Sequence, residues 1–185
     1  MDAKLVLQMQ CSLDGFMSGP NGELNWIFPN IDAEYTAWSV ARLERATAHL
    51  MGGVTYRDMA AHWPVSSEPF AEPMNRIPKI VFSRTVKHPE WRETQVIAGD
   101  LAENIARLKH ERRGELLAHG GLRFAQSLIR AKLVDEYRLM MHPVALGRGQ
   151  SIFAELAEPL RLARAGQTLF KGGVVVIELR PPGPT

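Results

Sequence analysis

The fold is decided by the stretch "LLAHGGLRFAQSLI" (Leu116–Ile129), in which an apolar run, two adjacent glycines and a helical pattern follow one another. The apolar run predicts a buried strand, and the spacing of Phe124 and Leu128 predicts a helix that packs one face against a sheet. Gly120 and Gly121 stand where the strand passes into the helix. Glycine there permits a positive φ and lets a ligand approach the backbone closely. The stretch is typical of a strand–turn–helix unit in an α/β protein.

Similar units precede this stretch, and strands alone follow it. A helix expected over residues 32–49 begins at Asp32, and a second over residues 100–114 begins at Asp100; aspartate is a favourable N-cap. The proline-rich residues 66–78 are expected to be irregular. The other expected elements are strands over residues 4–10, 49–53, 79–84, 94–99 and 115–119, helices over 54–63 and 122–133, and then strands over 134–146, 160–169 and 173–180.

This order of elements predicts an α/β fold with a mixed sheet. The alternation of strands and helices is typical of a parallel sheet with helices on both faces, and the last two strands can pair antiparallel at one edge. A length of 185 residues suits one domain with its own core. We therefore expect residues 1–180 to form a single domain and residues 181–185 to form a tail.

Composition excludes several functional classes. A net charge of +2 is too small to indicate nucleic-acid binding. No window approaches the ~20 apolar residues that a membrane span needs. The single cysteine, Cys11, cannot form an intramolecular disulfide, which fits the cytoplasm, where we expect the protein. No HExxH, CxxC or G-x-S-x-G motif occurs, so neither a metal site nor an α/β-hydrolase is expected.

Glycines mark three of the predicted strand ends, namely Gly52–Gly53, Gly99 and Gly120–Gly121. In open α/β sheets, ligands bind beyond the carboxyl ends of the strands, where helix N-termini suit phosphate. The first strand is not followed by G-x-G-x-x-G, and there is no G-x-x-x-x-G-K-[ST], so a standard Rossmann or P-loop site is not expected. Two interpretations stay open from these residues. The glycines either cradle a phosphate-bearing cofactor or only end strands and pack helices.

Four pieces of the chain, taken in order, resemble a known family. They are "SLDGFMSGPNGELNW" (Ser12–Trp26), "LMGGVTY" (Leu50–Tyr56), "KIVFSRT" (Lys79–Thr85) and "HGGLRFAQSLIRAKLVDEYRLMMHPVALGRGQSIF" (His119–Phe153). This succession resembles the stand-alone relatives of the RibD C-terminal reductase domain, within the dihydrofolate-reductase-like fold. The resemblance implies three layers, α-β-α, around a mixed sheet of about eight strands.

The resemblance also implies NADPH as the hydride donor and assigns residues to its binding. By that analogy the cofactor contacts come from the first strand, from two helix starts and from one strand end. They are Gln10 and Met17 beside the nicotinamide, Gly52, Val54 and Thr55 at the helix start that meets the pyrophosphate, Ser83 and Arg84 near the adenosine ribose, and Gly120, Gly121, Leu122 and Arg123 in a second phosphate-facing turn.

Two details of the phosphate-facing turns carry further expectations. Related dihydrofolate reductases carry a cis Gly-Gly peptide, and we predict one between Gly120 and Gly121. The family usually reads G-R-x-T-Y where this chain has "GGVTY", so Gly53 replaces an arginine that commonly helps bind the 2′-phosphate of NADPH. Arg84 or Arg57 can take its place, because a guanidinium makes bidentate contacts with phosphate; we hypothesise Arg84. If neither does, the preference for NADPH over NADH is weakened.

Four residues are candidates for the reaction itself. Asp14 and Asp32 are candidate catalytic carboxylates, Asp32 because dihydrofolate reductases keep their substrate carboxylate near the start of the first helix. Each also has a structural interpretation, Asp14 in a turn with the following glycine and Asp32 as an N-cap. Trp26 and Phe28 are candidates for the wall of a pocket that binds a flat heterocycle, although such residues also form cores.

The sequence thus leads to one expected function and two alternatives. The expected function is an NADPH-dependent reductase of a small heterocyclic substrate, resembling the 5-amino-6-(5-phosphoribosylamino)uracil reductase of riboflavin biosynthesis. The alternatives are a dihydrofolate-reductase-type activity and a non-catalytic, dimeric nucleotide-binding protein. A homodimer formed through the strand-rich C-terminal half is expected, as relatives often pair there.

Overall fold

One sheet runs through the middle of the protein, with its strands in the order β4-β3-β2-β5-β1-β6-β8-β7. The computed structural model describes residues 2–183, and within them the six strands from β4 to β6 are parallel, whereas β8 and β7 run antiparallel at one edge. This confirms the predicted mixed sheet and its antiparallel C-terminal edge. The strands are β1 (Lys4–Ser12), β2 (Ala46–Gly52), β3 (Lys79–Phe82), β4 (Thr94–Ile97), β5 (Glu115–Ala118), β6 (Glu136–His142), β7 (Ala163–Leu169) and β8 (Val175–Arg180).

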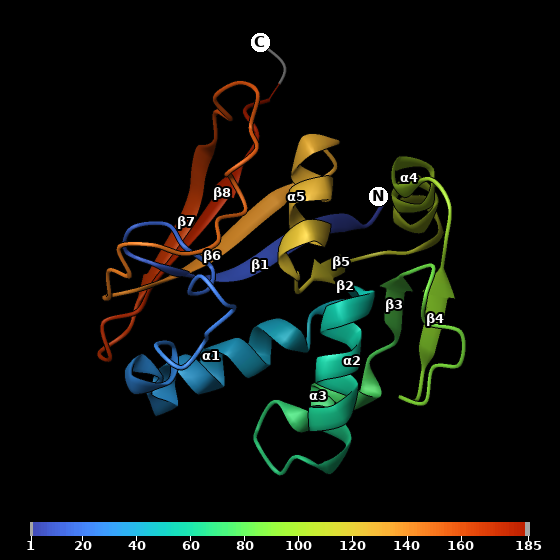
Figure 1. The fold of residues 1–185 in the computed structure, drawn as a ribbon, viewed down its shortest axis with the longest axis horizontal. Helices are drawn as coiled ribbons and strands as arrows, with labels where there is room; N and C mark the ends of the chain where they lie inside the picture. Colours follow the sequence, from blue (N-terminus) through green and yellow to red (C-terminus); the bar gives the residue numbers. More distant parts are fainter. Residues whose placement is uncertain (1, 184–185) are drawn as a thin grey trace.

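Helices cover both faces of the sheet and complete the three layers (Figure 1). On one face, α4 and α5 pack through residues such as Ile105 and Leu128 against Leu5 and Leu7 of β1. On the other face, α1, α2 and α3 bury a cluster that includes Val6. The helices are α1 (Ala33–Leu43), α2 (Gly53–His62), α3 (Ala71–Arg76), α4 (Leu101–Glu111) and α5 (Leu122–Arg130), with short 3-10 turns η1 (Phe28–Asn30) and η2 (Trp63–Val65).

The structure differs most from expectation in two segments, and both differences have a local physical reason. The helix expected over residues 32–49 ends at Leu43, because residues from Ala46 onward join β2 and pair with β5 and β3. The expected irregular segment 66–78 contains α3, in which Pro73 occupies the first turn. Proline is tolerated there because first-turn N–H groups have no partner within the helix.

Helix caps divide the helices into two groups. Asp32 Oδ1 accepts a hydrogen bond from Tyr35 N at 2.7 Å, and Asp100 Oδ1 accepts one from Glu103 N at 2.9 Å, as predicted. In contrast, α2 and α5 begin after Gly52 and Gly121, and neither receives a side-chain cap. The first N–H groups of α2 and α5 therefore stay available to a ligand.

Buried charged side chains of β5 and β6 lie on the face of the sheet that α1 covers. Arg138 on β6 is fully buried and contacts Glu115 at 3.2 Å and Glu136 at 3.1 Å. The same guanidinium donates to Gln8 Oε1 at 3.2 Å. A buried arginine that satisfies two carboxylates and one amide orients all three side chains.

Some expectations stay predictions at the level of the fold. The division into a domain of residues 1–180 and a tail of residues 181–185 stays a prediction. Residues 1 and 184–185 lie outside the described residues. Homodimerisation also stays a prediction. Among the described helices, none combines the length and the apolar character that a membrane crossing requires.

Candidate functional site

Two cavities open where the parallel strands end. The first cavity, of about 610 Å³, lies beyond β2, β3, β4 and β5 and is lined mainly by residues 52–55, 82–84, 97–99 and 121–124. The second cavity, of about 510 Å³, is lined by residues 8–10 of β1, by parts of the loop 17–27 and by one side of α2. Both lie at the carboxyl ends of the strands, where α/β sheets bind ligands.

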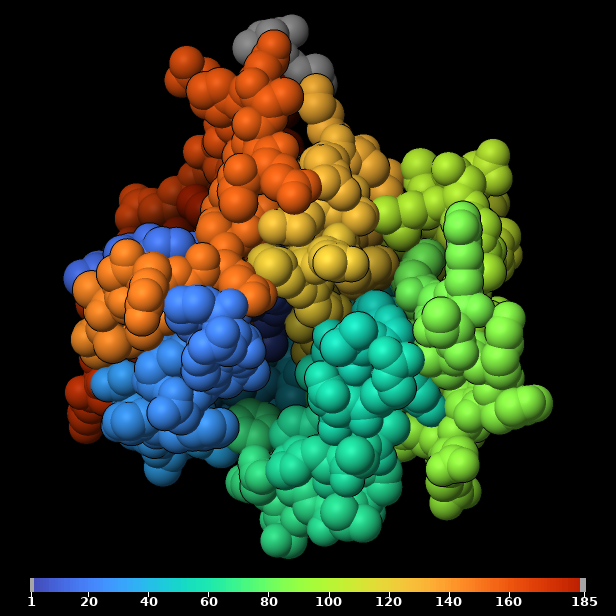
Figure 2. Space-filling model, in the orientation of Figure 1, coloured from blue at the N-terminus to red at the C-terminus, as the bar shows by residue number. Residues whose placement is uncertain are grey.

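The two cavities meet and form one cleft. Thr55, Gly121, Leu122 and Gln150 line both of them. Figure 2 shows the molecule hollowed between α2, the start of α5 and the loop that follows β1. An extended ligand can therefore lie in both cavities at once, passing over Gly121.

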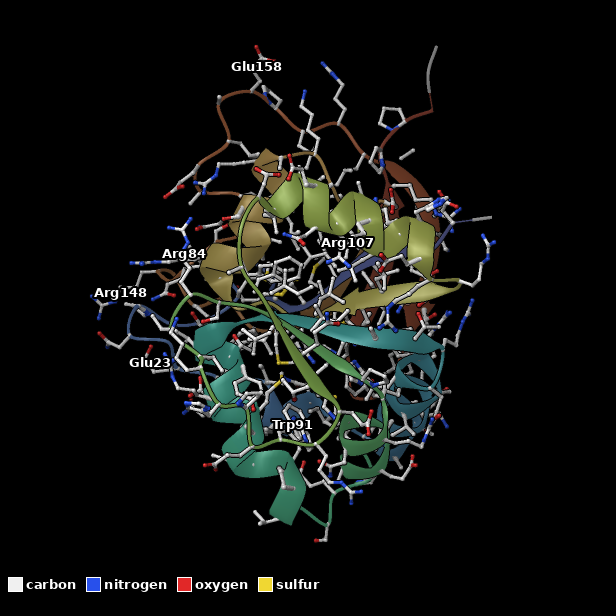
Figure 3. All side chains as sticks on the ribbon, turned by 90° about the vertical axis from the view of Figure 1, so that its right-hand side faces the viewer. Glu23, Arg84, Trp91, Arg107, Arg148 and Glu158 are labelled. Atoms are coloured by element: carbon white, nitrogen blue, oxygen red, sulfur yellow. The ribbon has the colours of Figure 1, made fainter. Side chains whose placement is uncertain are left out.

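The first cavity suits an anion. The uncapped N-termini of α2 and α5 both line it, and each presents unpaired N–H groups and the positive end of a helix dipole. Arg84 and Arg123 line it as well, whereas no aspartate or glutamate among the described residues does. Arg84 is exposed in the turn after β3 and extends at the edge of the molecule (Figure 3). A pyrophosphate or a phosphate monoester fits this set of donors.

Two glycines of the first cavity are required by close packing. A Cβ at position 53 would lie 2.6 Å from Ser83 Oγ, and a Cβ at position 121 would lie 2.7 Å from Thr55 Oγ1. Ser83 Oγ accepts hydrogen bonds from Thr85 N and Val86 N, both at 3.1 Å, so its position is held. The space beside position 53 is thus taken by Ser83, so a side chain at this position requires Ser83 to move.

A family comparison agrees with this geometry. Residues 3–176 match the model of the RibD C-terminal domain. The chain belongs to the RibD C-terminal domain family.

One curated relative and two solved structures resemble this RibD C-terminal domain over nearly its whole length. The uncharacterized protein YyaP of Bacillus subtilis (strain 168) is 28% identical over 94% of the chain and 93% of its own length. A putative riboflavin biosynthesis protein from Shewanella sp. PV-4 superposes with a TM-score of 0.78 at 22% identity, covering 99% and 100% of the two chains. Dihydrofolate reductase from Enterococcus faecalis, solved with NADP(H), gives a TM-score of 0.61 at 15% identity over 97% of each chain. The dihydrofolate-reductase-like fold is confirmed.

The structure brings most of the predicted cofactor residues of this RibD C-terminal domain together. Gln10 and Met17 line the second cavity. Gly120 lines neither; its carbonyl accepts a hydrogen bond from Gly52 N at 3.4 Å, and its peptide bond to Gly121 is cis, as predicted. The predicted residues that line the first cavity are Gly52, Val54, Thr55, Ser83, Arg84, Gly121, Leu122 and Arg123.

The two candidate catalytic carboxylates lie outside both cavities. Asp14 accepts hydrogen bonds from the Ser12 hydroxyl and from the N–H groups of Leu146 and Gly147, and these lower its pKa to about 2. Asp32 accepts from Tyr35 N and Gly172 N, both at 2.7 Å, and these bonds lower its pKa. Both carboxylates hold loops, so their structural interpretation is the one that the geometry supports.

The two aromatic residues expected in a substrate wall lie elsewhere too. Phe28 is 68% exposed and lines neither cavity. Trp26 donates to the carbonyl of Glu23 and packs edge-on against His142, with the ring centroids 5.4 Å apart.

Other residues of the second cavity were missed from the sequence. Gln8 lies beside Gln10 on the same face of β1, and His119 at the end of β5 hydrogen-bonds to buried His49 at 2.8 Å. Burial lowers the pKa of His119 to about 4, so its ring is neutral at pH 7. The helical spacing of one group was a usable signal: Thr55, Asp58, Met59 and His62 of α2 form a single stripe that lines the cavity.

Proposed function

We propose that this RibD C-terminal domain is an NADPH-dependent reductase of a small heterocyclic substrate. One observation carries the proposal: a cationic cavity with two uncapped helix N-termini joins, at Gly121, a second cavity with apolar walls. The first cavity offers donors for a dinucleotide's phosphates, and the second leaves room for a flat ring beside its nicotinamide. Adjacent sites of this kind are what hydride transfer between two bound molecules needs.

The protein's own groups would bind and orient. The N–H groups at the starts of α2 and α5, with Arg84 and Arg123, would hold the phosphates of NADPH, which supplies the hydride when bound. Met17, Met59 and Met140 form apolar walls of the second cavity and exclude water from the reacting ring. The Gln10 amide, fixed by Tyr35 and His142, limits where that ring can lie.

The position of Asp32 speaks for this function over a dihydrofolate-reductase-type activity. A pterin site of that type needs a carboxylate from the start of the first helix. In this chain both carboxylate oxygens of Asp32 already accept hydrogen bonds from backbone N–H groups. We therefore place dihydrofolate second among the candidate substrates.

The experiment is a titration followed by an activity assay. We expect NADPH to bind the purified protein, and we expect its reduced-nicotinamide absorbance to fall when a reducible ribosylaminopyrimidine is added. A protein without detectable affinity for NADPH or NADP⁺ would contradict the proposal. Tight binding without oxidation across ribosylaminopyrimidines and pterins would favour the non-catalytic nucleotide-binding protein.

Cofactor preference gives a first prediction. Replacing Arg84 with alanine is expected to weaken NADPH binding by about tenfold while leaving NADH binding nearly unchanged, because a guanidinium contact to the 2′-phosphate exists only for NADPH. Arg57→Ala is the matched control, since Arg57 is exposed and lines neither cavity. Both affinities can be measured by fluorescence titration. If the Arg84 variant leaves the ratio of the NADPH and NADH affinities unchanged, the assignment of Arg84 is wrong; a changed ratio in the Arg57 variant would then assign the contact to Arg57.

A further inference from the structure

The two cavities differ in charge. The first is lined by Arg84 and Arg123 and by no described carboxylate. The second is lined by Asp58 and, within residues 2–183, by no lysine or arginine. Asp58 is an exposed residue of the lining, and its carboxylate has no ion pair or hydrogen bond in the described part of the chain, so no neighbouring cation offsets its charge. Such a lining repels a second anion placed beside it.

The histidines of the second cavity do not reverse this balance. His119 shares a hydrogen bond with His49, and burial keeps both rings neutral by lowering the pKa of each. His62 lies 3.0 Å from the carboxylate of Glu68, so any positive charge on its ring is offset by that neighbour. The described residues of the lining therefore provide no lysine or arginine to hold a phosphate dianion.

Gln8 gives the second cavity a hydrogen-bond donor of known direction. Arg138 donates to Gln8 at 3.2 Å, and because arginine has only donors, the Gln8 atom that it contacts is the oxygen. The other polar atom of this amide, Gln8 Nε2, has no hydrogen-bond partner among the described residues. Since Gln8 lines the cavity, this N–H₂ group is placed to donate to a ligand carbonyl. Arg138 is held in turn by Glu115 and Glu136, which makes it a positioning residue for Gln8.

We propose that the second cavity selects an uncharged heterocycle that carries a ring carbonyl and no phosphate group. The carbonyl accepts from Gln8 Nε2, and the apolar walls enclose the ring. Asp58, together with the phosphates of a dinucleotide in the first cavity, disfavours a phosphorylated form of the same compound. This inference rests on the proposed function, because the second cavity is taken as the substrate site.

The test compares two ligands that differ only by a phosphate. The probes are 5-amino-6-(ribitylamino)uracil and its 5′-phosphate, each titrated calorimetrically into the full-length protein saturated with NADP⁺. We expect the unphosphorylated compound to bind more tightly by about tenfold, with the difference shrinking at high salt. Equal or tighter binding of the phosphate, or no binding of either compound, overturns the proposal. The preceding NADP⁺ titration reports separately on the proposed function.

Two isosteric variants assign the effect to residues. Asp58→Asn is expected to bring the affinity for the phosphorylated probe to within about threefold of that for the unphosphorylated probe. The substitution removes only the repulsion between the Asp58 carboxylate and the phosphate. Gln8→Glu keeps the oxygen that Arg138 contacts and removes the N–H₂ donor. This variant is expected to lower the affinity for the unphosphorylated probe by about tenfold without changing the affinity for NADP⁺. Glu103→Gln on α4, outside both cavities, is the control and should change neither value. An unchanged ratio in the Asp58 variant, or unchanged affinity in the Gln8 variant, contradicts the residue assignment and with it the proposal.

Discussion

Replacing Gly121 with valine is expected to raise the dissociation constant for NADPH by up to about 100-fold. Gly121 is the N-cap residue of α5 and lines both cavities, and a Cβ there would lie 2.7 Å from Thr55 Oγ1. Overpacking of this kind costs about 1–3 kcal/mol, and the new methyl groups also cover N–H groups that would face the pyrophosphate. Titration with NADPH measures the loss, and a urea melt reports whether the variant is still folded.

Two further variants separate the local clash from a general effect of the substitution. Gly183→Val is the matched control, because a Cβ there meets nothing within 4 Å. In a double-mutant cycle, Thr55→Ala is expected to recover part of the affinity that Gly121→Ala loses, since it removes the overlapping oxygen. Wild-type affinity in the Gly121 valine variant would show that the dinucleotide does not pass over this residue.

Replacing Arg138 with methionine is expected to lower the free energy of unfolding at pH 7 by about 3–5 kcal/mol. Only 1% of the Arg138 side chain is exposed, and its removal leaves Glu115 and Glu136 buried without their common partner. Urea denaturation measures the change. Arg107→Met is the control: Arg107 forms an exposed i,i+4 pair with Glu111, and such pairs contribute less than about 1 kcal/mol.

The deficit of the Arg138 variant should depend on pH in a defined direction. Burial raises the pKa of Glu136, but the Arg180 hydrogen bond and the charges of Lys4 and Arg138 lower it by more, so the net pKa is lowered. Glu136 therefore stabilises the fold above its ordinary pKa of 4.5, and this contribution is lost as the pH falls through the lowered value. A protonated Glu136 needs no arginine, so the difference between wild type and variant should narrow at pH 4. A deficit under about 1 kcal/mol at pH 7, or one that widens in acid, would contradict the assigned role.

The elements of the fold could mostly be predicted because their signals are local. The alternation of apolar runs with helical spacing, the caps at Asp32 and Asp100, and the glycines after β5 each depend on neighbouring residues. The boundary between α1 and β2 could not be predicted in the same way. Residues 46–49 suit a helix by composition, and they become a strand because β3 and β5 on either side supply a hydrogen-bond ladder.

The candidate site likewise contains residues whose positions follow from local sequence and residues whose roles depend on tertiary contacts. The residues predicted to face the phosphates lie close to strand ends. Ser83 follows β3, and Val54 and Leu122 lie in the first turns of α2 and α5, so their positions follow from the family motifs. The choice between a catalytic and a structural role for Asp14 and Asp32 could not be made from the sequence. A carboxylate that accepts hydrogen bonds from the backbone N–H groups of a distant loop has the same local sequence as one that faces a substrate.

By itself the sequence determined the α/β class, the mixed sheet, the family and the turns of the first cavity, since each depends on periodicity or on contiguous residues. Only the tertiary structure decided the second cavity. Gln8, Asp58 and His119 are far apart in the chain and line one cavity because β1 and β5 end, and α2 begins, at the same edge of the sheet. The direction of the Gln8 donor depends on Arg138, 130 residues away, and no local pattern encodes such a contact.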